Sequence, residues 1–152
     1  MNIVETLTGK SVEVRVLGVE SEDFKKLNKA RYFFNWNAYK KGYSVYKLTK
    51  SEEDDILGVM AIIDIPAELR IEISLLCCSK ENYSHTKQFD RIAGCLIASR
   101  EAVKKYGGNA AISLLPKTDL REHYKNKYGM EEAGRQIVLF GKNLLNLINE
   151  YL

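Results

Sequence analysis

A chain of 152 residues with 45% hydrophobic content is long enough for one domain with a substantial core, and we expect a single domain over residues 1–152. Its net charge of +3 and 28% charged residues do not supply the dense basic surface typical of nucleic-acid binding, so nucleic acid is disfavoured as a partner. No apolar run has the length of a signal peptide or a membrane span, so no membrane partner and a cytoplasmic location are expected.

The chain begins with the pattern of a β-hairpin. Apolar residues alternate with polar ones over 3–7 and again over 12–17, and the polar turn 8–10 lies between the two runs. The sheet is therefore expected to start near the N-terminus.

Two short helices are predicted after the hairpin. Ser21 is suited to cap the first helix, and Phe24, Leu27 and Ala30 follow it at helical spacing. A second short helix is expected over 34–41, within the most aromatic part of the chain. These aromatic side chains are explained equally well by an acceptor-binding wall, by core packing or by a homodimer interface.

Three successive antiparallel strands with short turns are expected in the middle of the chain, over 44–48, 56–65 and 71–77. Apolar residues then recur at helical spacing from Phe89, and the paired glycines 107–108 end that helix.

The last third of the chain continues the alternation of strands and helices. It predicts a strand over 109–115, a helix from Thr118 or Asp119 to Tyr128, a strand over 136–140 and a helix over 144–152. The order β-α-α-β-β-β-α-β-α-β-α is typical of an α/β fold with a sheet of mixed direction.

The segment 71–108 joins a strand, a polar loop with basic residues and a helix. Such a connection directs unpaired backbone N–H groups and the positive end of the helix dipole at one spot, where an anion is favoured. A phosphate-binding function is therefore sought there first.

The three cysteines, Cys77, Cys78 and Cys95, fit neither a disulfide framework nor a metal-binding spacing. Adjacent residues of a strand point to opposite faces, so Cys77 and Cys78 cannot act as a pair of ligands. All three are expected to be small apolar residues, and no metal is expected.

Three segments of the sequence, together with the element order, resemble the GCN5-related N-acetyltransferase (GNAT) superfamily, and more narrowly a group of small bacterial acetyltransferases within it. The segments are KQFDRIAGCLIA, GGNAAISLLPKTDLREHYKNKYGM and NLLNLINEYL. The resemblance covers nearly the whole chain. It implies an α/β fold with a mixed, mostly antiparallel central sheet flanked by helices on both faces, and binding of acetyl-CoA as a cosubstrate.

The signature of that superfamily, Gln/Arg-x-x-Gly-x-Gly/Ala, is not fully met in this chain. When it is aligned by the glycines that end the helix, it falls on Lys87, Asp90 and Ile92, and both glycines are lost. When it is aligned by the available glycine, it falls on 91–96, and two of three positions match.

Pyrophosphate needs backbone N–H groups that no bulky side chain covers, and Ala93 with Gly94 partly supplies them. Lys87 and Arg91 could neutralise the phosphate charge, and with Ile92 these residues form the candidate pyrophosphate site. Alternatively, Gly94 serves close packing of the helix on the sheet, and the two cations are ordinary solvated side chains. Asp90 favours this alternative, because its carboxylate would place a negative charge beside the pyrophosphate.

The resemblance also implies that the strand before the loop hydrogen-bonds the pantetheine arm through its backbone. By position this role falls on residues 75–78, opposite 113–115, so Leu76, Cys77 and Cys78 are candidate cofactor-binding residues. A strand that only packs in the core would show the same apolar sequence.

Acetyl transfer to an amine needs a base for the ammonium proton and a proton donor for the leaving thiolate. Glu72 lies in the strand that often carries the base in the resembled superfamily, although an outward-facing residue of a half-exposed sheet would look the same. Tyr124 lies near the position of the tyrosine that protonates the CoA thiolate there. Counted back from Gly129, however, Lys125 takes that position, and Tyr124 could instead pack in the core.

Two functions of different classes follow. One is an acetyl-CoA-dependent N-acetyltransferase that moves an acetyl group to a primary amine by direct transfer. The other is a non-catalytic protein of the same fold that binds acyl-CoA or a protein partner, because the signature and the tyrosine position depart from the pattern. Dinucleotide binding is disfavoured, because no Gly-x-Gly-x-x-Gly follows a strand.

Overall fold

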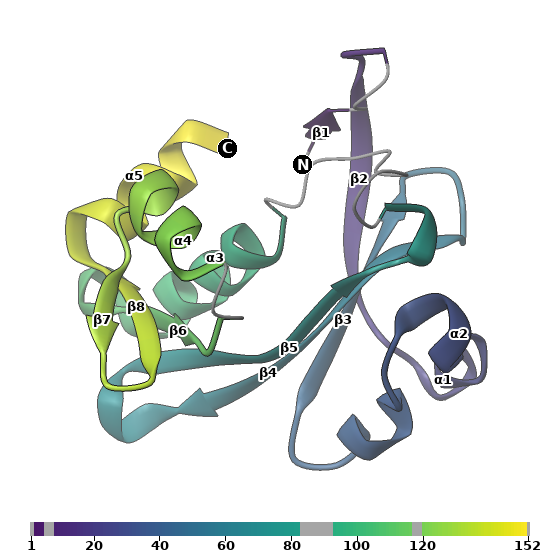
Figure 1. Cartoon of the computed structure of the whole chain (residues 1–152), viewed down its shortest axis with the longest axis horizontal. Helices are drawn as coiled ribbons and strands as arrows, with labels where there is room; N and C mark the ends of the chain where they lie inside the picture. Colours follow the sequence, from purple (N-terminus) through teal and green to yellow (C-terminus); the bar gives the residue numbers. More distant parts are fainter. Residues whose placement is uncertain (1, 5–7, 83–92, 117–119, 152) are drawn as a thin grey trace. The chain divides into compact units, whose positions relative to one another are not determined.

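The computed structural model of the protein describes residues 2–4, 8–82, 93–116 and 120–151 (Figure 1). Contacts within the chain group it into two compact units. The first comprises Met1–Ala61 and Leu75–Gly94, and the second comprises Ile62–Ser74 and Cys95–Leu152. A single domain over the whole chain stays a prediction. Within the ranges given above, no helix is long and apolar enough to cross a membrane.

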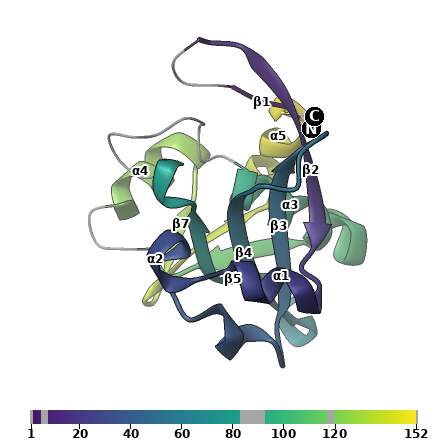
Figure 2. The same cartoon turned by 90° about the vertical axis from the view of Figure 1, so that its right-hand side faces the viewer.

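The first unit consists of strands and short helices. Its strands are β1 (Asn2–Val4), β2 (Ser11–Gly18), β3 (Ser44–Lys50), the first part of β4 (Ile56–Ile65) and the last part of β5 (Arg70–Cys78). Its helices are α1 (Ser21–Lys26), α2 (Lys29–Tyr32), and the 3-10 helices η1 (Trp36–Tyr39) and η3 (Lys80–Asn82). The pairs β1–β2 and β2–β3 are antiparallel, and Figure 2 shows β2 to β5 side by side. The predicted N-terminal hairpin is thereby confirmed.

The second unit contains the rest of β4 and β5 and the C-terminal half of the chain. Its other elements are η2 (Pro66–Glu68), α3 (Ala93–Tyr106), which starts in the first unit, η5 (Gly107–Asn109), β6 (Ala111–Leu114), α4 (Arg121–Tyr128), β7 (Glu131–Ala133), β8 (Gln136–Phe140) and α5 (Gly141–Tyr151). Figure 1 shows α4 beside α5, and α5 packs against β8.

Among the described residues, the strands form one sheet in the order β1-β2-β3-β4-β5-β6-β8-β7. β5 and β6 pair in parallel, whereas β6–β8 and β7–β8 are antiparallel. This mixed, mostly antiparallel sheet flanked by helices confirms the fold class expected from the sequence.

The core of the first unit is centred on two aromatic residues. The side chains of Tyr32 and Trp36 are each 1% exposed. Their polar atoms are satisfied, since the Tyr32 hydroxyl donates to the Ile56 carbonyl (2.9 Å) and the Trp36 indole N–H donates to the Tyr32 carbonyl (3.1 Å). Two of the aromatic side chains of the segment 31–39 are therefore core residues.

In the second unit the strand register aligns the apolar residues of one sheet face. Ile71 lies beside Ile112, and Ile73 lies beside Leu114, all four being buried. Alternate residues of a strand point to opposite faces, so Arg70, Glu72 and Ser113 share the other face. The polar chemistry of this unit is therefore confined to that second face.

The expected first helix is wrong in two respects. Glu20, not Ser21, is the N-cap of α1, and its backbone N–H donates to the Asp23 carboxylate (2.9 Å). The helix stops at Lys26, because the Asn28 side chain accepts the backbone N–H of Arg31 (2.9 Å) and starts α2 instead.

Two other expectations need correction. The helix expected over 34–41 is only the single 3-10 turn η1, because Phe33 has a positive φ of 69° and ends α2 just before it. The short strand β7 was not expected, because all of its side chains are exposed and it therefore lacks the apolar alternation by which strands are recognised.

Leu69 offers a direct test of backbone strain. It has a φ of 51° and is 40% exposed. Packing of its side chain therefore offsets little of the energetic cost of its left-handed backbone. We expect Leu69→Gly to raise the free energy of unfolding by about 0.5–1 kcal/mol, measured by urea denaturation.

The matched control is Leu17→Gly. Leu17 is 39% exposed but lies within β2, where glycine weakens the strand. This variant should lose about 1 kcal/mol. Equal effects of the two substitutions would contradict the assignment of strain to Leu69.

Candidate functional site

The C-terminal part of β5 carries three of the residues proposed to bind the cofactor. Cys77 is buried, and its thiol donates to the Tyr32 carbonyl (3.2 Å). Burial raises the pKa of the Cys77 thiol to about 12, so this thiol stays protonated near neutral pH. Leu76 and Cys78 are half-buried and point to the opposite face of the strand. The Cys77 side chain therefore packs in the core of the first unit, whereas Leu76 and Cys78 lie on the opposite face of the strand.

The parallel ladder between β5 and β6 is shorter than β5 itself. Its last pair is Ile73 with Leu114, where β6 ends, while β5 continues to Cys78. On its other edge this part of β5 lies against β4. The Ser79 N–H donates to the Leu57 carbonyl (2.9 Å), and a Cβ on Gly58 would lie 3.3 Å from the Cys77 carbonyl oxygen. Residues 75–78 thus form a strand end whose ladder with β6 has stopped.

Arg31 anchors the segment that follows β5. Its guanidinium makes a bidentate pair with Asp55 (2.8 and 3.0 Å) and a second pair with Glu81 of η3 (3.0 and 3.2 Å). Desolvation opposes ionisation of Glu81, but a backbone N–H and the side chains of Arg31 and Ser79 together lower the pKa of its carboxyl. Arg31 thereby links α2 to Asp55, the residue directly before β4, and to Glu81 of η3.

Three of the proposed pyrophosphate residues, Lys87, Arg91 and Ile92, lie outside the described residues. Ala93 and Gly94 are the first residues of α3 as the structure describes it, and the helix ends at Tyr106, followed by Gly107 with a φ of 63°. Pyrophosphate binding at this helix stays a prediction.

Glu72 lies in a polar cluster on the sheet of the second unit. Its Oε1 atom accepts hydrogen bonds from Arg70 (3.3 Å) and from the Gln136 amide (2.5 Å). The same Arg70 nitrogen also donates to the hydroxyl of Ser113, which is fully buried. The sheet face that carries Glu72 therefore also carries a guanidinium, an amide and a hydroxyl.

Arg70 holds this cluster together. Its side chain is 15% exposed and also pairs with Glu68 (2.6 Å). Sequence reasoning missed Arg70, Ser113 and Gln136. The available signal was the i, i+2 spacing of Arg70 and Glu72, which places opposite charges on one face of a strand.

Tyr124 lies in α4 and is half-buried. Its ring centroid is 5.9 Å from that of Tyr128 and 5.8 Å from that of His123. Lys125, the residue at the position usual for the tyrosine, pairs with Glu122 (3.4 Å) and Glu132 (3.8 Å). Tyr124 as the proton donor stays a prediction, as does Glu72 as the base.

Within the described ranges, no group of three or more His, Cys, Asp or Glu side chains is arranged to hold a metal ion. The expectation of a metal-free site stays a prediction, since the undescribed segments contribute further side chains of these types.

The chain has the fold of the GNAT acetyltransferases, as three solved structures show. Mutant forms of the spermidine/spermine N-acetyltransferase SpeG from Vibrio cholerae match with a TM-score of 0.62 and 13% identity, over 88% of this chain and 97% of theirs. A Bacillus subtilis acetyltransferase in complex with CoA matches with a TM-score of 0.56 and 12% identity, over 85% of this chain and 98% of that one.

The third is the ribosomal-protein-S18-alanine N-acetyltransferase from Escherichia coli, with a TM-score of 0.57 and 12% identity over 86% of this chain and 97% of that one. No protein-family model and no curated protein sequence matches this chain. The comparisons thus establish the fold, and the activity must be argued from the residues.

The contribution of the Arg70 charge to stability can be tested by Arg70→Met, which replaces the guanidinium by an uncharged, unbranched side chain. Glu72 then keeps only Gln136, and the buried Ser113 hydroxyl loses its donor. We expect a loss of about 2–3 kcal/mol in the free energy of unfolding, because a partly buried carboxylate is left without its cation.

The control is Lys104→Met, since Lys104 is 76% exposed and has only an i, i+3 partner. Its effect should stay within about 0.5 kcal/mol. A loss of that small size in Arg70→Met would show that the cluster contributes little to stability.

Proposed function

We propose that this protein is an N-acetyltransferase that uses acetyl-CoA and transfers the acetyl group directly to a primary amine. The observation that carries the proposal is the end of β5. This strand continues to Cys78 after its parallel ladder with β6 has ended at Ile73, on the fold of known acetyltransferases. The backbone of a strand can hydrogen-bond an extended ligand as it would another strand, and the part of β5 beyond its ladder with β6 suits a pantetheine arm.

The end of β5 and the start of α3 would hold the cofactor. The backbone of Leu76, Cys77 and Cys78 would bind the pantetheine arm, with the Cys77 side chain fixed in the core. Lys87 and Arg91 would neutralise pyrophosphate, and the backbone of Ile92, Ala93 and Gly94 would donate hydrogen bonds to it. Arg31, whose guanidinium is engaged by Asp55 and Glu81, would position this loop rather than bind phosphate itself.

Glu72 and Tyr124 would move protons. Both described hydrogen bonds to Glu72 fall on Oε1, and within the described residues Oε2 has no hydrogen-bond partner. Oε2, on a side chain that is 25% exposed, would take the proton of the acceptor ammonium. Tyr124 would donate its hydroxyl proton to the leaving thiolate.

When bound, acetyl-CoA supplies an acetyl thioester for attack by the neutral amine, so that a C–N bond forms and the C–S bond breaks. The ammonium gives up one proton to Glu72, which passes it to solvent, and the attacking nitrogen gives up a second proton when the amide forms. This second proton balances the one that Tyr124 donates to the thiolate, so the enzyme returns to its starting charge and the reaction releases one proton to solvent. No covalent enzyme intermediate is needed, and the protonated, buried Cys77 is not suited to form one.

One observation favours the alternative, a non-catalytic protein of the same fold that binds acyl-CoA or a protein partner. Glu72 is ion-paired to Arg70, as a carboxylate with a purely structural role would be. Binding and turnover must therefore be tested separately.

Cofactor binding is tested by the melting temperature in acetyl-CoA, CoA and pantetheine. At a hundred times the dissociation constant we expect a gain of about 2.7 kcal/mol, which corresponds to roughly 5–10 °C for a chain of this size. Gly94→Trp should abolish the shift by blocking the start of α3. Gly108→Trp is the control, because a Cβ at that position of η5 would meet no atom within 4 Å. The proposal fails if millimolar cofactor leaves the wild-type melting temperature unchanged.

Turnover is tested by release of free CoA with a panel of primary amines. We expect Glu72→Gln and Tyr124→Phe to keep the shift with acetyl-CoA but to lower kcat by about 10²–10⁴-fold, the usual contribution of a positioned acid or base. Glu131→Gln, which changes an exposed carboxylate of β7, should leave kcat unchanged. Cofactor binding without turnover on any amine would support the non-catalytic alternative.

A further inference from the structure

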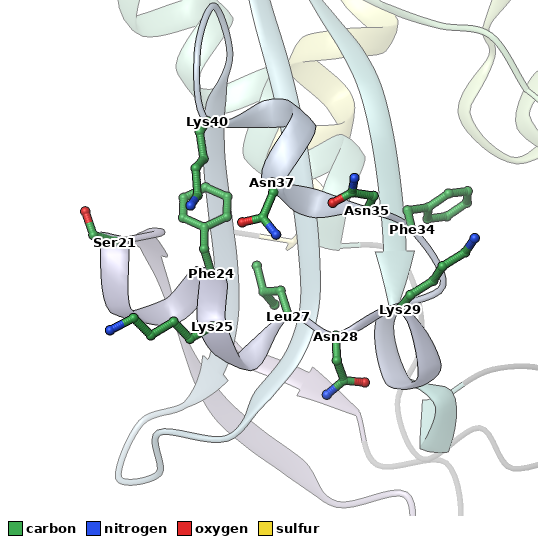
Figure 3. Close-up of a pocket in the computed structure, with 10 residues that line it drawn as sticks. All are labelled: Ser21, Phe24, Lys25, Leu27, Asn28, Lys29, Phe34, Asn35, Asn37 and Lys40. Carbon is green, nitrogen blue, oxygen red and sulfur yellow. The ribbon is translucent and has the colours of Figure 1, made fainter.

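A hollow of about 540 Å³ lies between α1, α2 and η1 in the first unit (Figure 3). Its volume is within the range of roughly 300–1,000 Å³ typical of small-molecule sites. None of the residues assigned above to the cofactor or to proton transfer lines it. Its side chains come from three short segments that are adjacent in sequence, so the hollow belongs to one unit.

The charged residues that line the hollow are all lysines, namely Lys25, Lys29 and Lys40. Within the described residues, none of them forms an ion pair with a carboxylate. Asp23, the buried acidic side chain of α1, is already bound by Lys47 (2.7 Å) and by a backbone N–H (2.9 Å). As far as the described residues go, the lysines of the lining therefore carry positive charge without a carboxylate partner.

The uncharged residues of the lining include apolar side chains and asparagine amides that can form hydrogen bonds. Phe24, Leu27 and Phe34 belong to or pack against the apolar core cluster of the first unit, so they form a fixed apolar wall. The ammonium of Lys40 lies 5.3 Å from the centre of the Phe24 ring. In Figure 3, Asn37 and Leu27 point toward one another across the hollow, so that an amide faces the apolar wall.

Phe34, which lines one side of the hollow, is held in a defined position. Phe33 has a φ of 69°, and the Phe34 N–H that follows it donates to the Tyr32 carbonyl (2.8 Å). A left-handed non-glycine residue costs of order 1–3 kcal/mol, so the position of Phe34 is held by the surrounding packing rather than by local preference. The apolar wall is thus formed before any ligand arrives.

We infer that this hollow binds a small organic anion, whose carboxylate or phosphate pairs with the lysines and whose aromatic or aliphatic part packs on Phe24, Leu27 and Phe34. Spermidine and spermine, the compounds named for SpeG of Vibrio cholerae, are disfavoured at this surface, because their ammonium groups would be repelled by three lysines that have no carboxylate partner among the described residues. The inference does not rest on the proposed acetyltransferase activity, because the site contains none of the residues used for it.

Binding is measured by titrating ¹⁵N-labelled full-length protein, without acetyl-CoA, with four probes that share one phenyl ring. Phenylacetate and phenyl phosphate carry the two anionic head groups, phenylacetamide is the neutral match, and 2-phenylethylamine is the cationic match. We expect amide signals of residues 21–40 to shift with both anions or with one of them, which identifies the preferred head group. Added salt should weaken this binding, because Lys25, Lys29 and Lys40 are exposed and ion pairs with exposed groups are screened.

The matched variants are Lys40→Gln and Lys41→Gln, since Lys41 is exposed and adjacent but does not line the hollow. Lys40→Gln should weaken anion binding about fivefold, and the double variant Lys29→Gln/Lys40→Gln about twentyfold, whereas Lys41→Gln should have no effect. Unchanged melting temperatures of the variants confirm that folding is retained. Equal binding of 2-phenylethylamine and the anions, no shift with either anion, or equal effects of Lys40→Gln and Lys41→Gln would overturn the inference.

Discussion

The backbone carbonyl of Tyr32 is the acceptor around which the first unit is built. It lies at the end of α2, where a helix leaves its last carbonyls without partners, and it is buried with the Tyr32 side chain. Three donors satisfy it: the Phe34 N–H (2.8 Å), the Trp36 indole (3.1 Å) and the Cys77 thiol (3.2 Å). One buried oxygen therefore fixes both the wall of the lysine-lined hollow and the end of β5.

The cations of the first unit fall into two groups with different chemistry. Arg31 is saturated by Asp55 and Glu81, so its charge is used to hold α2 and η3 together. The lysines of the hollow have no such partners among the described residues, and their charge remains available to a ligand. A saturated guanidinium positions the chain, whereas an unpaired ammonium beside an apolar wall is suited to recognition.

The fold was predictable because its signals are local. Apolar runs bounded by turn residues predicted β3, β4 and β8 close to their observed bounds, and Gly129, with a φ of 68°, ends α4 as expected. The errors have equally local causes. Asn28 competes for a backbone N–H and divides the first helix, and β7 shows no apolar alternation.

By itself the sequence determined most of the element order and the apolar sheet face, since these depend on periodicity along the chain, and the GNAT-like fold was implied by its resemblance to that superfamily. Only the tertiary structure decided which polar groups meet. Gln136 reaches Glu72 across a separation of 64 residues, and Arg31 reaches Glu81 across 50. No spacing rule links residues so far apart, because strand order and register set their distance. Lys25, Lys29 and Lys40 are close in sequence, but they line one hollow only because the chain turns between α1, α2 and η1.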